Sequence, residues 1–160
     1  MNPASVHTQV TLDDNSQFLN PEKLAIAGVS RNPKKFGNTV MKELAEKGFD
    51  VYPVNPDADT IRGHKCYHSV TDLPGDVRHL LIVTPRDQTL TVARDAVAKG
   101  IKKVWIQQMS DTPEAVKTLK DAGISVITGK CIMMFANPVH GPHRFHRFLV
   151  KIVGRYPKPA

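Results

Sequence analysis

Cysteine is scarce in this sequence, and long apolar runs are missing. Only two cysteines, Cys66 and Cys131, occur in 160 residues, which is too few for a disulfide scaffold and fits a reducing cytoplasm. No stretch approaches the roughly 18 consecutive apolar residues of a membrane-spanning helix. The first residues, MNPASVHTQVTLDD, lack the cationic start and apolar segment of a signal peptide. We therefore expect a cytoplasmic protein without a transmembrane segment.

Acidic residues are missing from the C-terminal end. The net charge is +7, and the segment from His140 onwards carries five basic residues and no acidic one. These are Arg144, Arg147, Lys151, Arg155 and Lys158. The rest of the chain is close to charge balance, so the basic character belongs to a tail more than to a domain. It is weak evidence for a nucleic acid partner.

The order of residues contains no Ser-His-Asp set and no clear pair of carboxylates, so no catalytic residue is predicted. His140, His143 and His146 recur at intervals of three, with Cys131 upstream. Zinc binds such side chains, but residues 141–142 are Gly-Pro and interrupt the spacing. Surface or helix-capping histidines are the favoured interpretation, and no metal site is expected.

What the sequence does contain is an alternation of apolar runs and helical periodicity. Strands are predicted over residues 23–28, 50–55, 79–85, 102–107 and 124–128, and helices after residue 37, over 89–99 and over 113–122. Residues 57–79 show no clear period. Strands that alternate with helices predict an α/β fold: a Rossmann-like three-layer sandwich around a parallel sheet of about five strands. Ligands of such sheets lie beyond the carboxyl ends of the strands.

Three segments are expected: an N-terminal arm over residues 1–20, the Rossmann-like domain over 21–135, and a basic C-terminal helix and tail over 136–160. The last segment is amphipathic, since Phe145, Phe148, Leu149, Ile152 and Val153 share one face at helical spacing. That face either packs on the domain or on a second subunit of a homodimer, or it binds RNA or anionic lipid together with the basic side chains.

The first strand is followed by the loop GVSRNPKKFG, residues 28–37. A strand that passes into a helix here leaves the first helical N–H groups pointing forward, where they bind an anion such as a phosphate. Gly28 permits the turn, Ser30 offers a hydroxyl, and Arg31, Lys34 and Lys35 add positive charge. The alternative is a plain tight connection with solvated lysines and no ligand.

The loop departs from the known nucleotide fingerprints. A dinucleotide-binding G-x-G-x-x-G motif would have glycine where Ser30 stands, and an acid would close the second strand. That strand instead ends at Asn55 and Pro56, with Asp57 beyond the proline. The P-loop motif is also missing. An NAD(P)-dependent oxidoreductase therefore remains only an alternative.

The same residues resemble a known family. The G-x-S turn, the following K-x-G and the segment YPVNP that closes the second strand look like the small stand-alone CoA-binding proteins. These are similar to the CoA-binding domain of ADP-forming acyl-CoA synthetases and of the succinyl-CoA synthetase alpha subunit. The resemblance covers about residues 20–135, and it implies coenzyme A as the ligand.

The resemblance also implies which residues meet that ligand. Gly28, Val29 and Ser30 would hold a CoA phosphate with Lys35 nearby, Asn55 and Pro56 would border the adenosine, and Thr84 and Pro85 would line the same cleft. The synthetases also need a phosphorylated histidine domain and a nucleotide-grasp module, for which 160 residues leave no room. We therefore expect a CoA- or acyl-CoA-binding protein without a catalytic centre.

Cys131 follows the fifth strand at the ligand edge, next to Lys130. In that place it is either a partly activated thiol, able to form a mixed disulfide with the CoA thiol, or a small buried core residue. The core interpretation is favoured, and Cys131 is kept as a candidate site residue.

Overall fold

The structure of the protein is a computed structural model, and it describes residue 18 and residues 23–135. The predicted helix in the basic tail and the histidines at 140, 143 and 146 lie outside the described residues, as does most of the N-terminal arm. Among the described residues, no helix is long and apolar enough to span a membrane.

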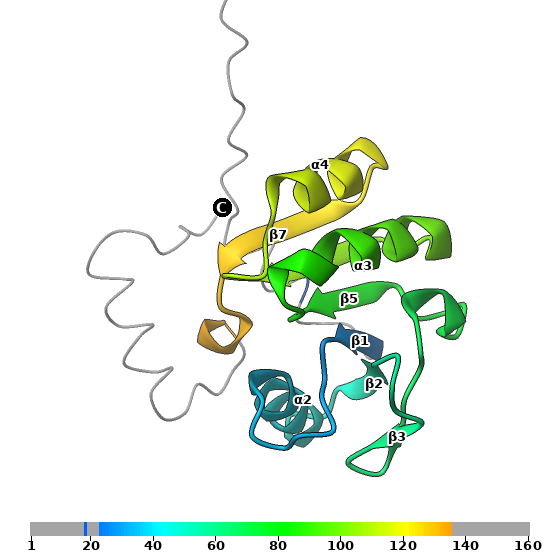
Figure 1. The fold of residues 1–160 in the computed structure, drawn as a ribbon, viewed down its shortest axis with the longest axis vertical. Helices are drawn as coiled ribbons and strands as arrows, with labels where there is room; N and C mark the ends of the chain where they lie inside the picture. The colour runs from blue at the N-terminus through cyan, green and yellow to red at the C-terminus, as the bar shows by residue number, and fades with distance from the viewer. Residues whose placement is uncertain (1–17, 19–22, 136–160) are drawn as a thin grey trace, which may run out of the picture.

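A five-stranded sheet forms the centre of the fold (Figure 1). Its strands are β1 (Lys23–Ala27), β2 (Asp50–Val54), β5 (His79–Ile82), β6 (Lys103–Gln107) and β7 (Ser125–Lys130). They lie in the order β2-β1-β5-β6-β7, and every neighbouring pair is parallel. The predicted parallel sheet is therefore confirmed. After β2 the chain crosses to the other side of β1, so the strand order reverses between β1 and β5.

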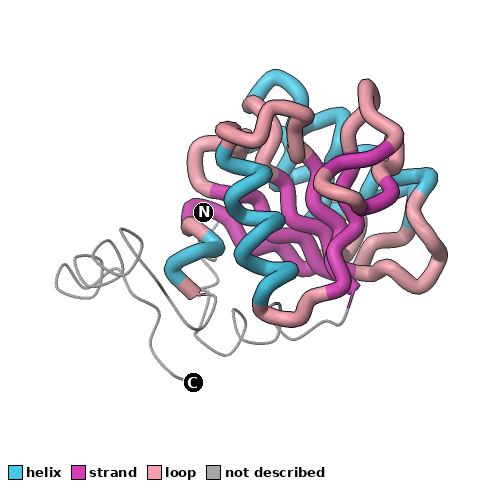
Figure 2. The backbone as a smooth tube through the Cα atoms, turned by 90° about the horizontal axis from the view of Figure 1, so that it is seen from below, coloured by secondary structure: helices cyan, strands magenta, loops and turns pink. Residues whose placement is uncertain are grey.

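Helices cover both faces of the sheet. They are α2 (Phe36–Glu46), α3 (Arg86–Lys99) and α4 (Pro113–Asp121). Leu24 and Ile26 of β1 belong to the core under α2, whereas Ala25 and Ala27 belong to the core under α3 and α4. This alternation follows from the two-residue period of a strand. Figures 1 and 2 show the resulting three layers, with the strands in the middle, as the Rossmann-like prediction requires.

Helix α3 begins three residues earlier than predicted. Pro85 takes the N-cap position and Arg86 begins the helix, while the prediction used Thr89 as the start. Thr89 is fully buried, and its hydroxyl donates to the Ser110 carbonyl at 2.7 Å. It therefore ties the interior of α3 to the β6–α4 loop.

The stretch without periodicity, residues 57–79, contains short elements. Strands β3 (Thr60–Ile61) and β4 (His64–Lys65) form an antiparallel hairpin. The 3-10 helix η1 (Val70–Asp72) follows, capped by Ser69. Strands of two residues are too short for a period to show in the sequence. The hairpin and η1 carry the chain from β2 across to β5.

The α2 face of β6 and β7 is covered by aromatic side chains. Phe18 lies edge-on to Trp105 with ring centroids 5.5 Å apart, and Trp105 lies 5.6 Å from Phe135. Phe135 ends the short 3-10 helix η2 (Ile132–Met134). Phe18 is 1% exposed, so this residue of the predicted N-terminal arm is part of the core.

Candidate functional site

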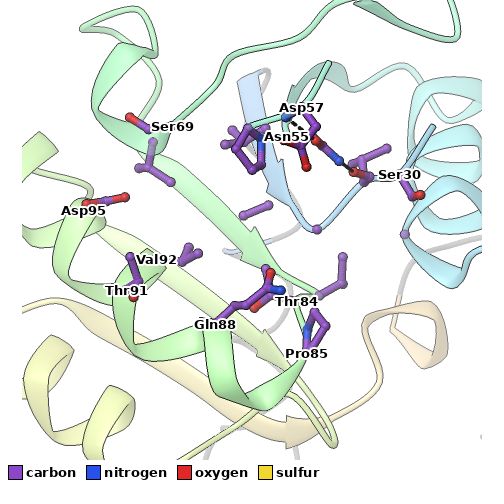
Figure 3. A pocket seen from close by; sticks show the side chains of 18 of the residues that line it. Ser30, Asn55, Asp57, Ser69, Thr84, Pro85, Gln88, Thr91, Val92 and Asp95 are labelled. Atoms are coloured by element: carbon purple, nitrogen blue, oxygen red, sulfur yellow. Dashed lines mark hydrogen bonds between the residues drawn. The ribbon is translucent and has the colours of Figure 1, made fainter. Parts of the chain in front are cut away.

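A cavity of about 790 Å³ opens at the carboxyl ends of β1, β2 and β5, where the strand order reverses. This size lies within the range of roughly 300–1,000 Å³ that is usual for ligand pockets. Figure 3 shows Ser30, Asn55 and Asp57 on one side of the cavity and Thr91, Val92 and Asp95 of α3 on the other. The position agrees with the rule that α/β sheets bind ligands at the switch point.

The cavity brings together eight of the ten predicted site residues. Those that line it are Gly28, Val29, Ser30, Lys35, Asn55, Pro56, Thr84 and Pro85. Arg31 and Cys131 are not among its lining residues. Contact of the eight with a ligand stays a prediction.

Two glycines let the backbone segments around the turn between β1 and α2 approach closely. A Cβ on Gly28 would lie 2.7 Å from the Val83 carbonyl carbon, and Gly28 has a φ of +103° that favours glycine. A Cβ on Gly37 would lie 2.6 Å from the Gly28 carbonyl oxygen. The start of α2 therefore packs directly against the end of β1, and neither position has room for a side chain.

Asparagine side chains hold the loop between β1 and α2 in place. The Asn38 amide, 1% exposed, donates to the carbonyls of Ser30 at 2.6 Å and Asn32 at 2.8 Å. The Asn55 amide donates to the Val29 carbonyl at 2.6 Å. These hydrogen bonds to the loop carbonyls hold the backbone between β1 and α2 in this conformation. Asn55 therefore supports the turn in addition to lining the cavity.

The Ser30 hydroxyl is placed to meet a ligand. Its oxygen accepts from the Asn32 N–H at 3.1 Å, and a hydroxyl that accepts in this way still has a proton to donate. Ser30 is half-buried and lines the cavity. A ligand oxygen is a suitable acceptor for that proton.

The N-termini of α2 and α3 both face the cavity. In the described part of the chain, no side chain caps either of them: the N-cap residues are Lys35 and Pro85, and both line the cavity. The N-terminus of α4, by contrast, is capped by the Thr112 hydroxyl, which accepts from the Ala115 N–H at 3.2 Å. Two uncapped helix dipoles and the Lys35 ammonium favour an anion at this end of the cavity.

Thr84 contributes to the cavity wall mainly by holding it together. The Thr84 side chain is buried, and its hydroxyl lies 3.1 Å from that of Thr89. Because Thr89 donates to the Ser110 carbonyl, its oxygen accepts from Thr84. The pair fixes the β5–α3 connection that forms the floor of the site.

The far end of the cavity is partly apolar and carries a carboxylate. Val54, Val70 and Val92 line it together with Ser69 and Asp95. Burial raises the pKa of the Asp95 carboxyl, and the nearby Asp72 raises it further. The Asp95 carboxylate is a half-buried acceptor in a partly apolar part of the cavity. It suits a ligand group that is flat and apolar but carries a hydrogen-bond donor.

His68 also lines the cavity, and its Nε2 atom lies 2.9 Å from Asp59 Oδ1. Asp57 lies on the same rim, where its N–H donates to the Asn55 side-chain oxygen at 2.8 Å. Asp57 follows the second strand and its proline in the sequence and was not among the predicted site residues.

Cys131 does not have the environment of an activated thiol. It is 3% exposed, and burial raises the pKa of its thiol. The core interpretation agrees with this position, and the activated-thiol interpretation does not. Burial raises the pKa of the Cys66 thiol as well.

Sequence reasoning missed Asn38, Asp57, His68 and Asp95. Asn38 looks like a surface position of a helix, and His68 falls in the stretch without periodicity. Asp95 lies in a helical pattern far from any motif, so only the packing of α3 against η1 shows where it belongs. Asp57 was recognisable as the first acid after the second strand. Among the described residues, no cluster of histidine, cysteine, aspartate and glutamate could hold a metal ion.

The doubly wound parallel sheet and the cavity at its switch point define a Rossmann-like α/β ligand-binding domain. The profile described as the CoA binding domain matches residues 22–137. The chain belongs to this CoA-binding domain family, and the resemblance noted in the sequence is confirmed.

Relatives include both large enzymes and small proteins. The chain is 32% identical to the alpha subunit of acetate–CoA ligase [ADP-forming] II of Pyrococcus furiosus, over 72% of this chain but only 28% of that subunit. It is 28% identical to the uncharacterized protein YneT of Bacillus subtilis, over 69% of this chain and 82% of that protein. A conserved hypothetical protein from Pyrococcus furiosus has a structure that matches with a TM-score of 0.68 at 45% identity, covering 71% of this chain and 98% of that one.

Proposed function

We propose that the protein binds coenzyme A or an acyl-CoA, with a phosphate of the ligand at the turn between β1 and α2. The observation that carries the proposal is the close approach of Gly28 and Gly37 beside the uncapped N-terminus of α2, in a cavity of about 790 Å³. Family membership supports CoA as the ligand.

Charge supports the same orientation. CoA carries a pyrophosphate, and each charge-assisted hydrogen bond to such an anion contributes about 1.5–3 kcal/mol. Ser30, Lys35 and the first turn of α2 supply donors at one end of the cavity. The other end has valines and a carboxylate, which suit an uncharged part of the ligand.

A dinucleotide such as NAD is the second candidate, and one observation favours it. Asp57 lines the cavity just beyond β2, close to where an acid holds the ribose hydroxyls in dinucleotide-binding folds. A ribose that carries a 3′-phosphate, as in CoA, would be repelled by a carboxylate in contact with that phosphate. Dephospho-CoA and NAD therefore belong in the test.

The test is calorimetric titration of the protein with CoA, acetyl-CoA, dephospho-CoA, NAD and NADP. We expect saturable CoA binding that weakens at least about tenfold in Ser30→Glu, because the new carboxylate would face the phosphate. The matched control is Ser125→Glu, which adds the same charge at the exposed start of β7, at the opposite edge of the sheet.

The outcome separates the candidates. Equal binding of CoA by wild type and Ser30→Glu would place the site elsewhere. Saturable NAD binding without CoA binding would favour the dinucleotide candidate instead.

A further inference from the structure

Asp95 lies at the end of the cavity opposite the phosphate-binding turn. It projects from α3 next to Thr91 and Val92, and Ser69 faces it from the start of η1 (Figure 3). Ser30 lies at the other end of the same space. A ligand whose phosphate meets Ser30 and which fills the cavity therefore reaches Asp95 with a different part of its structure.

No residue that the structure describes engages the Asp95 carboxylate. Within residues 23–135, no hydrogen bond or ion pair to its oxygens is formed, and the neighbouring charge is another carboxylate, Asp72. The side chain is half-buried. A partly desolvated acceptor of this kind is stabilised when a ligand donor pairs with it.

The chemistry of CoA limits which of its groups can pair with Asp95. The phosphates are excluded because they carry the same charge. The donors of CoA are the 6-amino group of adenine, the ribose 2′-hydroxyl, and the hydroxyl and amide N–H groups of the pantetheine arm. The adenine ring is flat and apolar on its faces, which fits a space lined by Val54, Val70 and Val92.

We propose that Asp95 recognises the base of the ligand by accepting a hydrogen bond from the 6-amino group of adenine. This inference depends on the proposed function, since it assigns the nucleoside end of the same site. It predicts that the protein distinguishes adenine from a 6-oxo purine, in which an oxygen replaces the amino group and faces the carboxylate as a second acceptor.

The experiment compares CoA with deamino-CoA, in which hypoxanthine replaces adenine, by calorimetric titration of the wild type and Asp95→Asn. Wild type should bind CoA at least about tenfold more tightly than deamino-CoA. In Asp95→Asn the preference should fall below about threefold, because an amide can accept from an amino group or donate to a 6-oxo group. Asp121→Asn, the same change on an exposed residue at the end of α4, should keep the wild-type preference.

Each result decides between the proposals. A wild-type protein that does not bind CoA overturns both the proposed function and this inference. If CoA binds but Asp95→Asn keeps the wild-type preference for adenine, only the role of Asp95 is wrong. A loss of CoA affinity with the preference unchanged assigns Asp95 to the ribose or pantetheine and overturns base recognition. Thermal unfolding of each variant shows whether the fold is intact.

Discussion

At the scale of single residues, the site depends on two positions, Gly28 and Gly37, that have no Cβ atom. Gly37 has ordinary helical geometry, so its backbone would accept another residue, but a Cβ would lie 2.6 Å from the Gly28 carbonyl oxygen. Asn38 supports the same loop by donating to two backbone carbonyls. Gly37 and Asn38 therefore allow the loop and the start of α2 to pack closely beside the cavity.

Gly37→Ala tests this close approach without changing charge. We expect it to lower the free energy of unfolding by about 1–3 kcal/mol, because the added methyl group forces α2 away from β1. CoA binding should weaken as well, since the displaced turn no longer presents Ser30 and the first turn of α2 together. Urea denaturation and calorimetry measure the two effects.

Gly75→Ala is the matched control, because no atom outside Gly75 and its two chain neighbours lies within 4 Å of a Cβ there, and its φ is not positive. Unchanged stability and affinity in Gly37→Ala would mean that the turn tolerates displacement and does not define the site.

At the scale of elements, β5 runs between the site and the buried contact of His79 with Phe18. Its carboxyl end leads into Thr84 and Pro85 at the cavity, and its first residue, His79, meets Phe18 edge-on at 5.7 Å. The Nε2 atom of His79 is buried without a hydrogen-bond partner in the described part of the chain. Burial, followed by the charge of Lys103, lowers the pKa of His79 below its ordinary value of 6.5.

This lowered pKa predicts how stability depends on pH. The unfolded chain protonates His79 at a higher pH than the folded protein does, so His79 favours the folded state above about pH 6.5. Its contribution is lost as the pH falls from there through the lower, folded pKa. Urea denaturation at pH 7.5 and 5.5 should show a larger loss of stability for wild type than for His79→Gln. Equal losses, or an NMR titration that places the pKa of His79 at or above 6.5, would contradict the prediction.

At the scale of the whole molecule, the sequence predicts the architecture well because the periods of strands and helices survive in it. The apolar run of β1 predicts the fold class, and the Gly28-x-Ser30 turn predicts which end of the sheet the cavity occupies. The sequence does not predict Phe18 in the core or Asp95 in the cavity, because both depend on contacts between segments far apart in the chain. Asn38 is missed for a different reason: its partners are backbone carbonyls only six and eight residues upstream, in a loop that has no period to show its shape.

The chain matches only part of the length of its large relatives. It covers 28% of the length of the acetate–CoA ligase subunit, so the similarity extends over that part of the subunit alone. For the chain itself, the arrangement of cavity, glycines and helix N-termini supports ligand binding.

The crystal structure of the protein grown with CoA is the most direct test of this account. We predict that the pyrophosphate lies within hydrogen-bonding distance of the Ser30 hydroxyl and the first turn of α2, with adenine between the valines near Asp95. Ordered CoA bound elsewhere on the protein, or a cavity that contains only solvent at saturating CoA, would contradict it.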